Sequence, residues 1–167
     1  MLLYHGSNLI VDKPRLLEQT RGLDFGAGFY LTTSEEQAVR FSEIILARRR
    51  SGVAIVNIYD LNIIDAEANL SIKRFGYANS EWLNFDTENR LKIYKRKNYD
   101  IVIGAVANDI VMPTLQAYLG GFLNEEATLM TLKTSKLVDQ YCLKTINALS
   151  FLKFIKSYES ITDGSDG

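Results

Sequence analysis

The chain has 167 residues, of which 47% are apolar and 23% charged, and this composition predicts one globular domain rather than a disordered, collagen-like or fibrous protein. Nineteen basic and twenty acidic residues leave a formal charge of −1, so no overall positive field draws the chain to nucleic acid or membranes. One histidine and one cysteine exclude an internal disulfide framework and argue against a zinc site, so we expect no bound metal.

We expect no targeting segment in this sequence. The N-terminal segment lacks the basic and apolar regions of a signal peptide, and no stretch approaches the roughly 20 apolar residues of a membrane span. We therefore expect a cytoplasmic protein without membrane association. We expect residues 1–156 to form the domain and residues 157–167, rich in Ser, Asp and Gly, to form a flexible polar tail.

The first half of the chain predicts short strands around one helix. Residues 2–4 indicate a first strand, Pro14 opens a segment expected to hold one helical turn, and residues 29–32 form a β-prone run. Ser34 followed by two glutamates and a glutamine is a capping box, so a helix is expected from there to the three arginines at 48–50. Its apolar face is expected to contain Ala38, Phe41 and Ile45.

The second half mixes strands and helices without regular βαβ alternation, which favours an α+β fold over a doubly wound sheet. Strands are expected at 53–59, 101–106 (a central strand) and 137–143. Helices are expected at 80–90, 108–119, 124–132 and 145–155, and the two middle ones open with an asparagine that can cap them.

The single histidine, His5, lies in the sequence Tyr-His-Gly-Ser. Its plainest interpretation is a structural side chain satisfied by one backbone hydrogen bond. Ser7 lies too close to His5 along the chain to act as a hydrolase nucleophile, and no Gly-x-Ser-x-Gly turn is present. Gly6 is more informative, because a glycine beside a polar side chain lets a ligand reach the backbone directly.

A second motif begins with Gly26 and Gly28. It lacks the third glycine of a dinucleotide-binding loop and the Gly-Lys-Ser/Thr of a P-loop, so neither nucleotide fold is predicted. A bulged turn before a core strand is the structural alternative.

Taken together, the motifs resemble the ADP-ribosyltransferase superfamily, in the branch with a His-Tyr-Glu triad that includes diphtheria toxin and the poly(ADP-ribose) polymerases. The resemblance spans residues 2–155. The arrangement of motifs as a whole is similar to that of an uncharacterised bacterial family within the superfamily. It implies an ADP-ribosyltransferase-like split β-sandwich of two small sheets with flanking helices. The segments that carry it are Tyr4-His5-Gly6-Ser7, Gly28-Phe29-Tyr30-Leu31-Thr32, the helix with Ala38 and Phe41, Tyr99–Gly104 and Asp139–Leu143.

The resemblance implies that the catalytic set is His5, Tyr30 and Gln140, and that NAD, as substrate, is bound by His5, Gly6, Ser7, Tyr30 and Phe41. His5 would bond the adenosine ribose and the Gly6 backbone would hold the nicotinamide carboxamide. Tyr30 and Phe41 would cover the two nicotinamide faces, and Gln140 would reach the ribose attached to nicotinamide. Ala38 stands where many polymerases have a serine, so that contact is missing here.

The chemistry requires more than Gln140 alone supplies. Breaking the bond between nicotinamide and ribose develops oxocarbenium character, which negative potential near the anomeric carbon stabilises. A glutamine accepts a hydrogen bond from a ribose hydroxyl but carries no charge. Asp139 cannot substitute, because adjacent strand residues point to opposite faces. Asp24 or Asp109 could approach the site, and simple exposure to solvent is the alternative for both.

The resemblance therefore implies a mono-ADP-ribosyltransferase acting on a macromolecular acceptor, protein or nucleic acid. Such domains often serve as toxins of toxin–antitoxin pairs or in phage defence, which makes a small antitoxin protein a candidate partner. Three alternatives stay open: a degenerate module that binds NAD or ADP-ribose, an enzyme that removes a 2′-phosphate from RNA, and a purely structural origin of the motifs. The basic runs at 48–50 and 95–97 could steer nucleic acid, or could be a helix end and a solvated loop.

Overall fold

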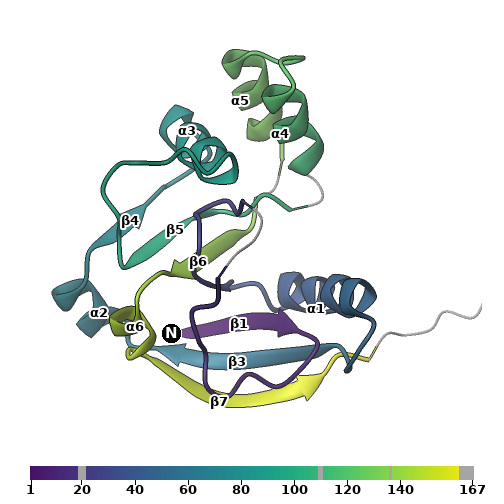
Figure 1. Ribbon diagram of the computed structural model, residues 1–167, viewed down its shortest axis with the longest axis vertical. Helices are drawn as coiled ribbons and strands as arrows, with labels where there is room; N and C mark the ends of the chain where they lie inside the picture. Colours follow the sequence, from purple (N-terminus) through teal and green to yellow (C-terminus); the bar gives the residue numbers. More distant parts are fainter. Residues whose placement is uncertain (19–21, 109–110, 136, 162–167) are drawn as a thin grey trace, which may run out of the picture.

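The computed structural model describes residues 1–18, 22–108, 111–135 and 137–161. It is an α+β fold with two small open sheets of three and four strands and, within these residues, six helices. The predicted fold class is thus confirmed at this level. Figure 1 shows the three-stranded sheet at one end of the molecule, the four-stranded sheet beside it, and a layer of helices at the other end.

The three-stranded sheet consists of β1 (Leu2–Ser7), β3 (Ile55–Leu61) and β7 (Leu152–Glu159), in the order β1-β3-β7. All of its pairings are antiparallel. Because side chains alternate along a strand, Leu3, Tyr59 and Leu61 face the second sheet, while Val56 and Ile58 pack with Ala38 of α1 (Glu35–Arg49). This is the burial on both faces that the apolar alternation of β3 predicts.

The four-stranded sheet has the order β2-β6-β5-β4, with β2 (Phe29–Leu31), β6 (Asp139–Leu143), β5 (Ile101–Ala105) and β4 (Ile72–Arg74). Only β4 and β5 run parallel. One face, with Phe29 and Tyr141, packs toward the first sheet. The other face, with Val102 and Cys142, packs against the helices around the fully buried Trp82.

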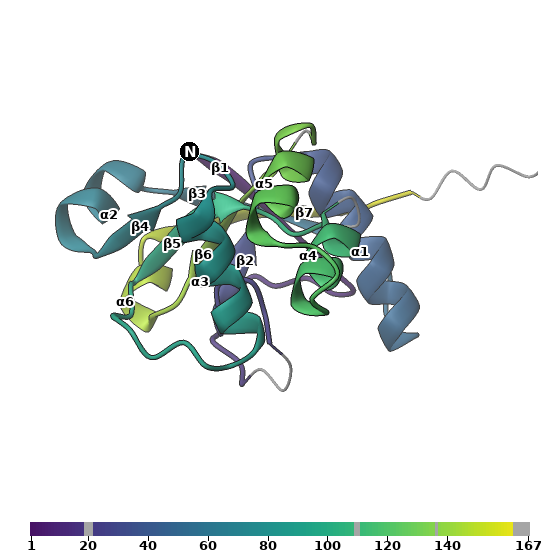
Figure 2. The ribbon, with the colours of Figure 1, turned by 90° about the horizontal axis from the view of Figure 1, so that it is seen from above.

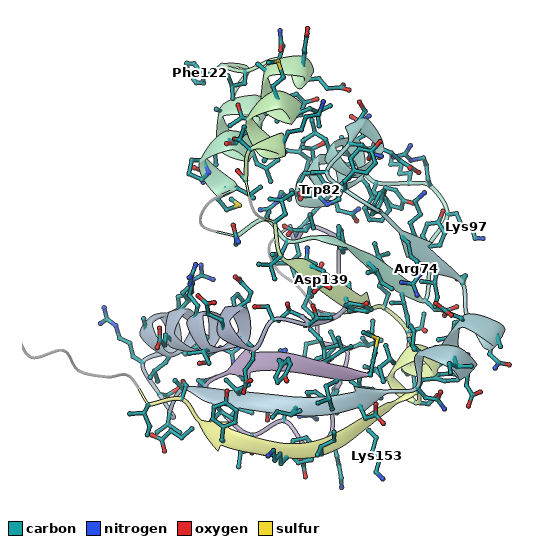
Figure 3. The ribbon with its side chains drawn as sticks, turned by 180° about the vertical axis from the view of Figure 1, so that it is seen from behind. Arg74, Trp82, Lys97, Phe122, Asp139 and Lys153 are labelled. Atoms are coloured by element: carbon teal, nitrogen blue, oxygen red, sulfur yellow. The ribbon has the colours of Figure 1, made fainter. Side chains whose placement is uncertain are left out.

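Three helices cover that second face: α3 (Ser80–Arg90), α4 (Met112–Leu119) and α5 (Glu125–Lys133). Figure 2 shows them lying over the strands, and Figure 3 places Trp82 within their layer. Two shorter helices, α2 (Ile63–Asn69) and α6 (Ile146–Leu149), connect the sheets.

The structure confirms several of the helix caps, helices and strands that were predicted from short stretches of sequence. Ser34 caps α1 by accepting from Gln37 N at 3.2 Å, and Asn124 caps α5 by accepting from Ala127 N at 2.8 Å. The predicted helix at 80–90 is α3, and the predicted central strand is β5, which lies inside its sheet.

The predicted helix over 145–155 is wrong. Only Ile146–Leu149 is helical, and the chain then forms β7, whose residues pair with β3. The predicted loose tail from residue 157 is wrong for Ser157, Tyr158 and Glu159, which pair with Asn57, Val56 and Ile55. The open edge of β3 provides backbone partners that a sequence pattern does not show. Residues 162–167 of the predicted tail lie outside the described residues.

Other boundaries also differ from the expectation. No helical turn forms in residues 14–18, and the helix expected from Asn108 begins at Met112. The short elements α2 and β4 were not predicted. On α1 the buried residues are Ala38 and Ser42, whereas Phe41 is 37% exposed, so the predicted apolar face is rotated.

Candidate functional site

The candidate site lies where the two sheets meet, at an isolated bridge between β1 and β2. Tyr4 N donates to Thr32 O at 2.8 Å, and Thr32 N donates to Tyr4 O at 3.0 Å. Within the described residues, β1 and β2 share no further backbone pairing. On the other edge of β1, Met1 and Leu61 exchange both backbone hydrogen bonds, so alternation along the antiparallel pair directs the peptide groups of Tyr4 and Gly6 away from β3. The N–H and C=O of Gly6 therefore point toward the edge on which β2 lies.

Gly6 is a glycine because α1 rests on it. A Cβ at this position would lie 2.1 Å from Ala38 O and 2.7 Å from Ser42 N. The expectation from sequence was that this glycine opens the backbone to a ligand. In the structure, the absence of a side chain at Gly6 allows the backbone of α1 to pack against this residue. A ligand could therefore contact Gly6 only through its backbone N–H and C=O.

His5 connects the two sheets. Its Nδ1 lies 2.7 Å from the backbone oxygen of Tyr30, and because a carbonyl only accepts, Nδ1 carries the proton. Nε2 therefore has the lone pair of a hydrogen-bond acceptor. Burial lowers the pKa of His5 to about 4; the Tyr30 bond opposes the shift and the cation of Arg49 adds to it. The imidazole, stacked at 4.4 Å on the ring of Phe29, is thus neutral at neutral pH.

Tyr30 is brought to His5 by its backbone, whereas its side chain lies on the other face of β2. The hydroxyl donates to Gly26 O at 2.6 Å and accepts from Phe25 N at 3.0 Å. Burial, with the nearby Cys142 and Asp24, raises the pKa of Tyr30 well above its ordinary value. The phenol therefore holds the glycine-rich loop in place and remains protonated, and only its ring is suited to contact a ligand.

Gln140 shares the helix-covered face of the sheet with Tyr30, because Tyr30 pairs with Cys142, two residues further along β6. It is 5% exposed. Its Nε2 donates to Asp24 Oδ2 at 2.8 Å and approaches Ala105 O at 3.4 Å. Asp24 is thus the carboxylate beside Gln140, and the alternative of simple solvent exposure is wrong for it; Asp109 lies outside the described residues.

Asp139 turns away from this cluster, as expected. Its carboxylate accepts from Thr33 N at 3.0 Å and from Thr33 Oγ1 at 2.7 Å. These bonds anchor the end of β2 near the junction of the sheets, where Figure 3 labels Asp139.

Asp24 belongs to a buried charge network that the sequence did not reveal. Arg90 bonds Asp24 Oδ1, and its Nε donates to Asp86 Oδ1 at 2.7 Å. Asp86 is fully buried, and within the described part of the chain its Oδ2 has no hydrogen-bond partner. Burial and the neighbouring Asp24 raise the pKa of Asp86 well above its ordinary value. The only sequence signal was the four-residue spacing of Asp86 and Arg90 on α3.

Phe41 and Ser7 are less closely associated with this group. The ring of Phe41 is 37% exposed on the helix that rests on Gly6, and among the described residues no ring contact joins it to Tyr30. Ser7 is buried and pairs with Ile55. Arg49, which belongs to the basic run at 48–50, donates to Asn8 Oδ1 at 3.3 Å, and its cation lowers the pKa of His5.

Two surface hollows lie away from the candidate site. One, of about 280 Å³, is lined by residues that include Lys73, Tyr94 and Lys97, and the other, of about 450 Å³, by residues that include Asp65 and Lys153. In the basic run at 95–97, Arg96 pairs with Glu88 at 2.7 Å and covers the ring of Tyr94, which fits a solvated loop.

The described residues contain no group of three or more His, Cys, Asp or Glu side chains that could hold a metal ion. None of the helices in this part of the chain has the length and apolar character needed to cross a membrane.

The comparison with protein families identifies the chain's family. The chain belongs to the DUF3990 family, described as proteins of unknown function, whose model matches residues 1–154. That match includes His5, Tyr30 and Gln140. Comparison with curated proteins and with solved structures found no match.

Proposed function

We propose that the protein binds NAD at the junction of β1 and β2 and is a mono-ADP-ribosyltransferase. One observation carries the proposal: the neutral imidazole of His5 is bonded to the Tyr30 carbonyl, next to a Gly6 peptide group directed toward the same edge. The second motif thus orients the imidazole through the Tyr30 carbonyl, and the first motif presents His5 and Gly6 side by side as hydrogen-bonding groups.

These groups match the polar parts of NAD. A carboxamide has one acceptor oxygen and one donor nitrogen, which the N–H and C=O of a single glycine peptide can satisfy together. The acceptor Nε2 of His5 suits a ribose hydroxyl. Arg49, whose cation lowers the pKa of His5, would attract the pyrophosphate. The two small sheets with flanking helices agree with the split β-sandwich that the resemblance implies.

The reaction requires the bond between nicotinamide and ribose to break, with the bonding electron pair leaving on the nicotinamide. The positive charge that develops on the ribose is stabilised by nearby negative potential. We propose that Gln140 accepts from a hydroxyl of this ribose and that the Asp24 carboxylate, 2.8 Å behind the amide, supplies the negative potential. A nucleophile of the acceptor then attacks the anomeric carbon and loses its proton.

The test is to incubate the protein with NAD labelled in the adenylate portion, with and without a cell extract. Nicotinamide release and transfer of label to macromolecules are expected for the wild type and are expected to be lost in His5→Ala. Calorimetric titration with NAD should give heat for the wild type. A trace without heat would rule out the proposal.

A second candidate is a module that binds NAD or ADP-ribose without turnover. It is favoured by the amide of Gln140 and by the pairing of Asp24 with Arg90, which reduces the charge available for catalysis. Heat on titration without nicotinamide release would select this alternative.

The acceptor and the partner of the proposed enzyme follow only from the resemblance. We propose a macromolecular acceptor, a toxic activity in the producing cell and a small neutralising protein. Induced expression of wild type, His5→Ala and Gln140→Ala tests the toxic activity. Equal growth of all three strains would contradict it.

A further inference from the structure

We propose that Asp24 is a positioning residue that orients the side-chain amide of Gln140 so that Oε1 faces the bound ribose. This inference rests on the proposed function, and it assigns a role to a residue of the glycine-rich loop that the motif comparison left without one.

The orientation follows from the groups that surround the amide. Nε2 of Gln140 lies 2.8 Å from Asp24 Oδ2 and 3.4 Å from Ala105 O. A carboxylate and a carbonyl only accept hydrogen bonds, so the amide nitrogen must face them. Rotating the amide by half a turn would set Oε1 against both oxygens. In a side chain that is 5% exposed, water cannot readily compensate for that loss.

Asp24 is itself held in place on both of its oxygens. Arg90 bonds Oδ1, and the N–H of Ala107 donates to Oδ2 at 3.0 Å. The loop that follows is fixed by the Tyr30 hydroxyl, and Lys144 donates to Phe25 O and to Ala27 O, the latter at 3.0 Å. The carboxylate therefore presents a fixed acceptor to Gln140.

This arrangement also explains why an amide occupies position 140. A glutamate there would place a second carboxylate against Asp24, and two like charges at hydrogen-bond distance cannot both be ionised at low cost. An acid in the loop and an amide on β6 form a complementary pair. Together they provide one acceptor, Oε1, directed away from Asp24, and one nearby negative charge.

The first variant for the test is Asp24→Asn. The new amide cannot satisfy all of its neighbours, because an NH2 group in place of Oδ1 opposes Arg90 and one in place of Oδ2 opposes both the N–H of Ala107 and the amide of Gln140. Either placement removes the charged acceptor that orients Gln140, so Oε1 is held toward the ribose less firmly. We expect kcat for nicotinamide release to fall by about tenfold or more, with KM for NAD changed by less than about threefold, because the lost interaction acts mainly in the transition state.

Asp86→Asn is the matched control. It makes the same substitution on the other side of Arg90, and in the described part of the chain Asp86 has no hydrogen bond with Gln140. It should leave kcat close to the wild-type value. An Asp24→Asn protein with wild-type kcat, or equal losses in both variants, would overturn the proposal.

The reversed pair is a second test. Gln140→Glu is expected to be less active than wild type, and Asp24→Asn/Gln140→Glu is expected to exceed Gln140→Glu, since one acid and one amide are restored. If Gln140→Glu is more active than wild type, position 140 requires an acid and the proposal is wrong.

A readout without turnover separates this inference from the proposed function. NMR should show slowed exchange of the Gln140 side-chain NH2 protons in the wild type, faster exchange in Asp24→Asn, and no change in Asp86→Asn. Absence of any nicotinamide release by the wild type would defeat the proposed function, whereas fast exchange in the wild type would defeat the orientation by Asp24.

Discussion

The imidazole Nδ1 of His5 lies 2.7 Å from the carbonyl oxygen of Tyr30, so a side chain of one sheet satisfies a backbone group of the other. The bond forms beside the bridge between Tyr4 and Thr32, where the two sheets meet. It fixes the tautomer of the only histidine, and it links the structural role of this residue to its proposed role in binding.

Protonation of His5 should make stability depend on pH. The pKa of His5 is lowered from 6.5 to about 4 in the folded protein, so the unfolded chain binds the proton first as pH falls. The stabilisation is complete above about pH 6.5 and is lost progressively toward pH 4; this loss is on the order of 3 kcal/mol. Urea unfolding of wild type and His5→Gln across this range is the measurement. The difference between the two proteins should shrink as pH falls, and a constant difference would contradict the prediction.

Asp86→Asn should show the opposite dependence. Because burial raises the pKa of Asp86 in the folded state, the folded protein keeps this proton after the unfolded chain has lost it. Wild-type stability should then decline as pH rises above about 4, by up to about 1.4 kcal/mol per pH unit, until the folded carboxyl ionises. Asn removes that dependence, so the variant should gain stability relative to wild type as pH rises. Thermal unfolding of both proteins at several pH values tests this prediction. A difference in stability between Asp86→Asn and wild type that is the same at every pH would show that Asp86 is ionised throughout.

Gly6→Ala should destabilise the fold through backbone contact. The new Cβ would meet Ala38 O at 2.1 Å, so either β1 or α1 must shift, at a cost of about 2–4 kcal/mol. Gly76→Ala is the control, because a Cβ there meets nothing within 4 Å. Chemical denaturation should separate the two variants clearly. Equal stabilities would mean that α1 adjusts without cost.

Tyr30→Phe should loosen the glycine-rich loop while keeping the aromatic ring. It removes the hydroxyl that bonds Gly26 O and Phe25 N, which we expect to cost about 1–3 kcal/mol. Tyr77→Phe, at a side chain that is 68% exposed, should change stability by less than about 0.5 kcal/mol. Hydrogen exchange at Phe25 should become faster only in Tyr30→Phe, and unchanged exchange there would show that other contacts hold the loop.

The amino-acid sequence by itself determined the helices and strands whose formation depends on residues close together in the chain. Ser34 and Asn124 cap their helices by accepting a hydrogen bond from the residue three positions further on. All five residues of the apolar strand β5 are buried. It also placed His5 and Tyr30 on two early strands. These predictions succeeded because caps and alternation act over a few residues of chain.

Tertiary structure alone decided the rest. Residues 152–159 form a strand because the edge of β3 offers them partners, although their apolar pattern also suits a helix. Asp24 meets Gln140 across 116 residues of sequence, and Arg90, on a helix that lies between them in sequence, bonds Asp24. Contacts between distant segments depend on how sheets and helices pack, and no local pattern of residue types encodes that packing. The sequence therefore offered Asp24 and Asp109 as alternative acids, whereas the hydrogen bond that sets Asp24 beside Gln140 became visible only in the folded chain.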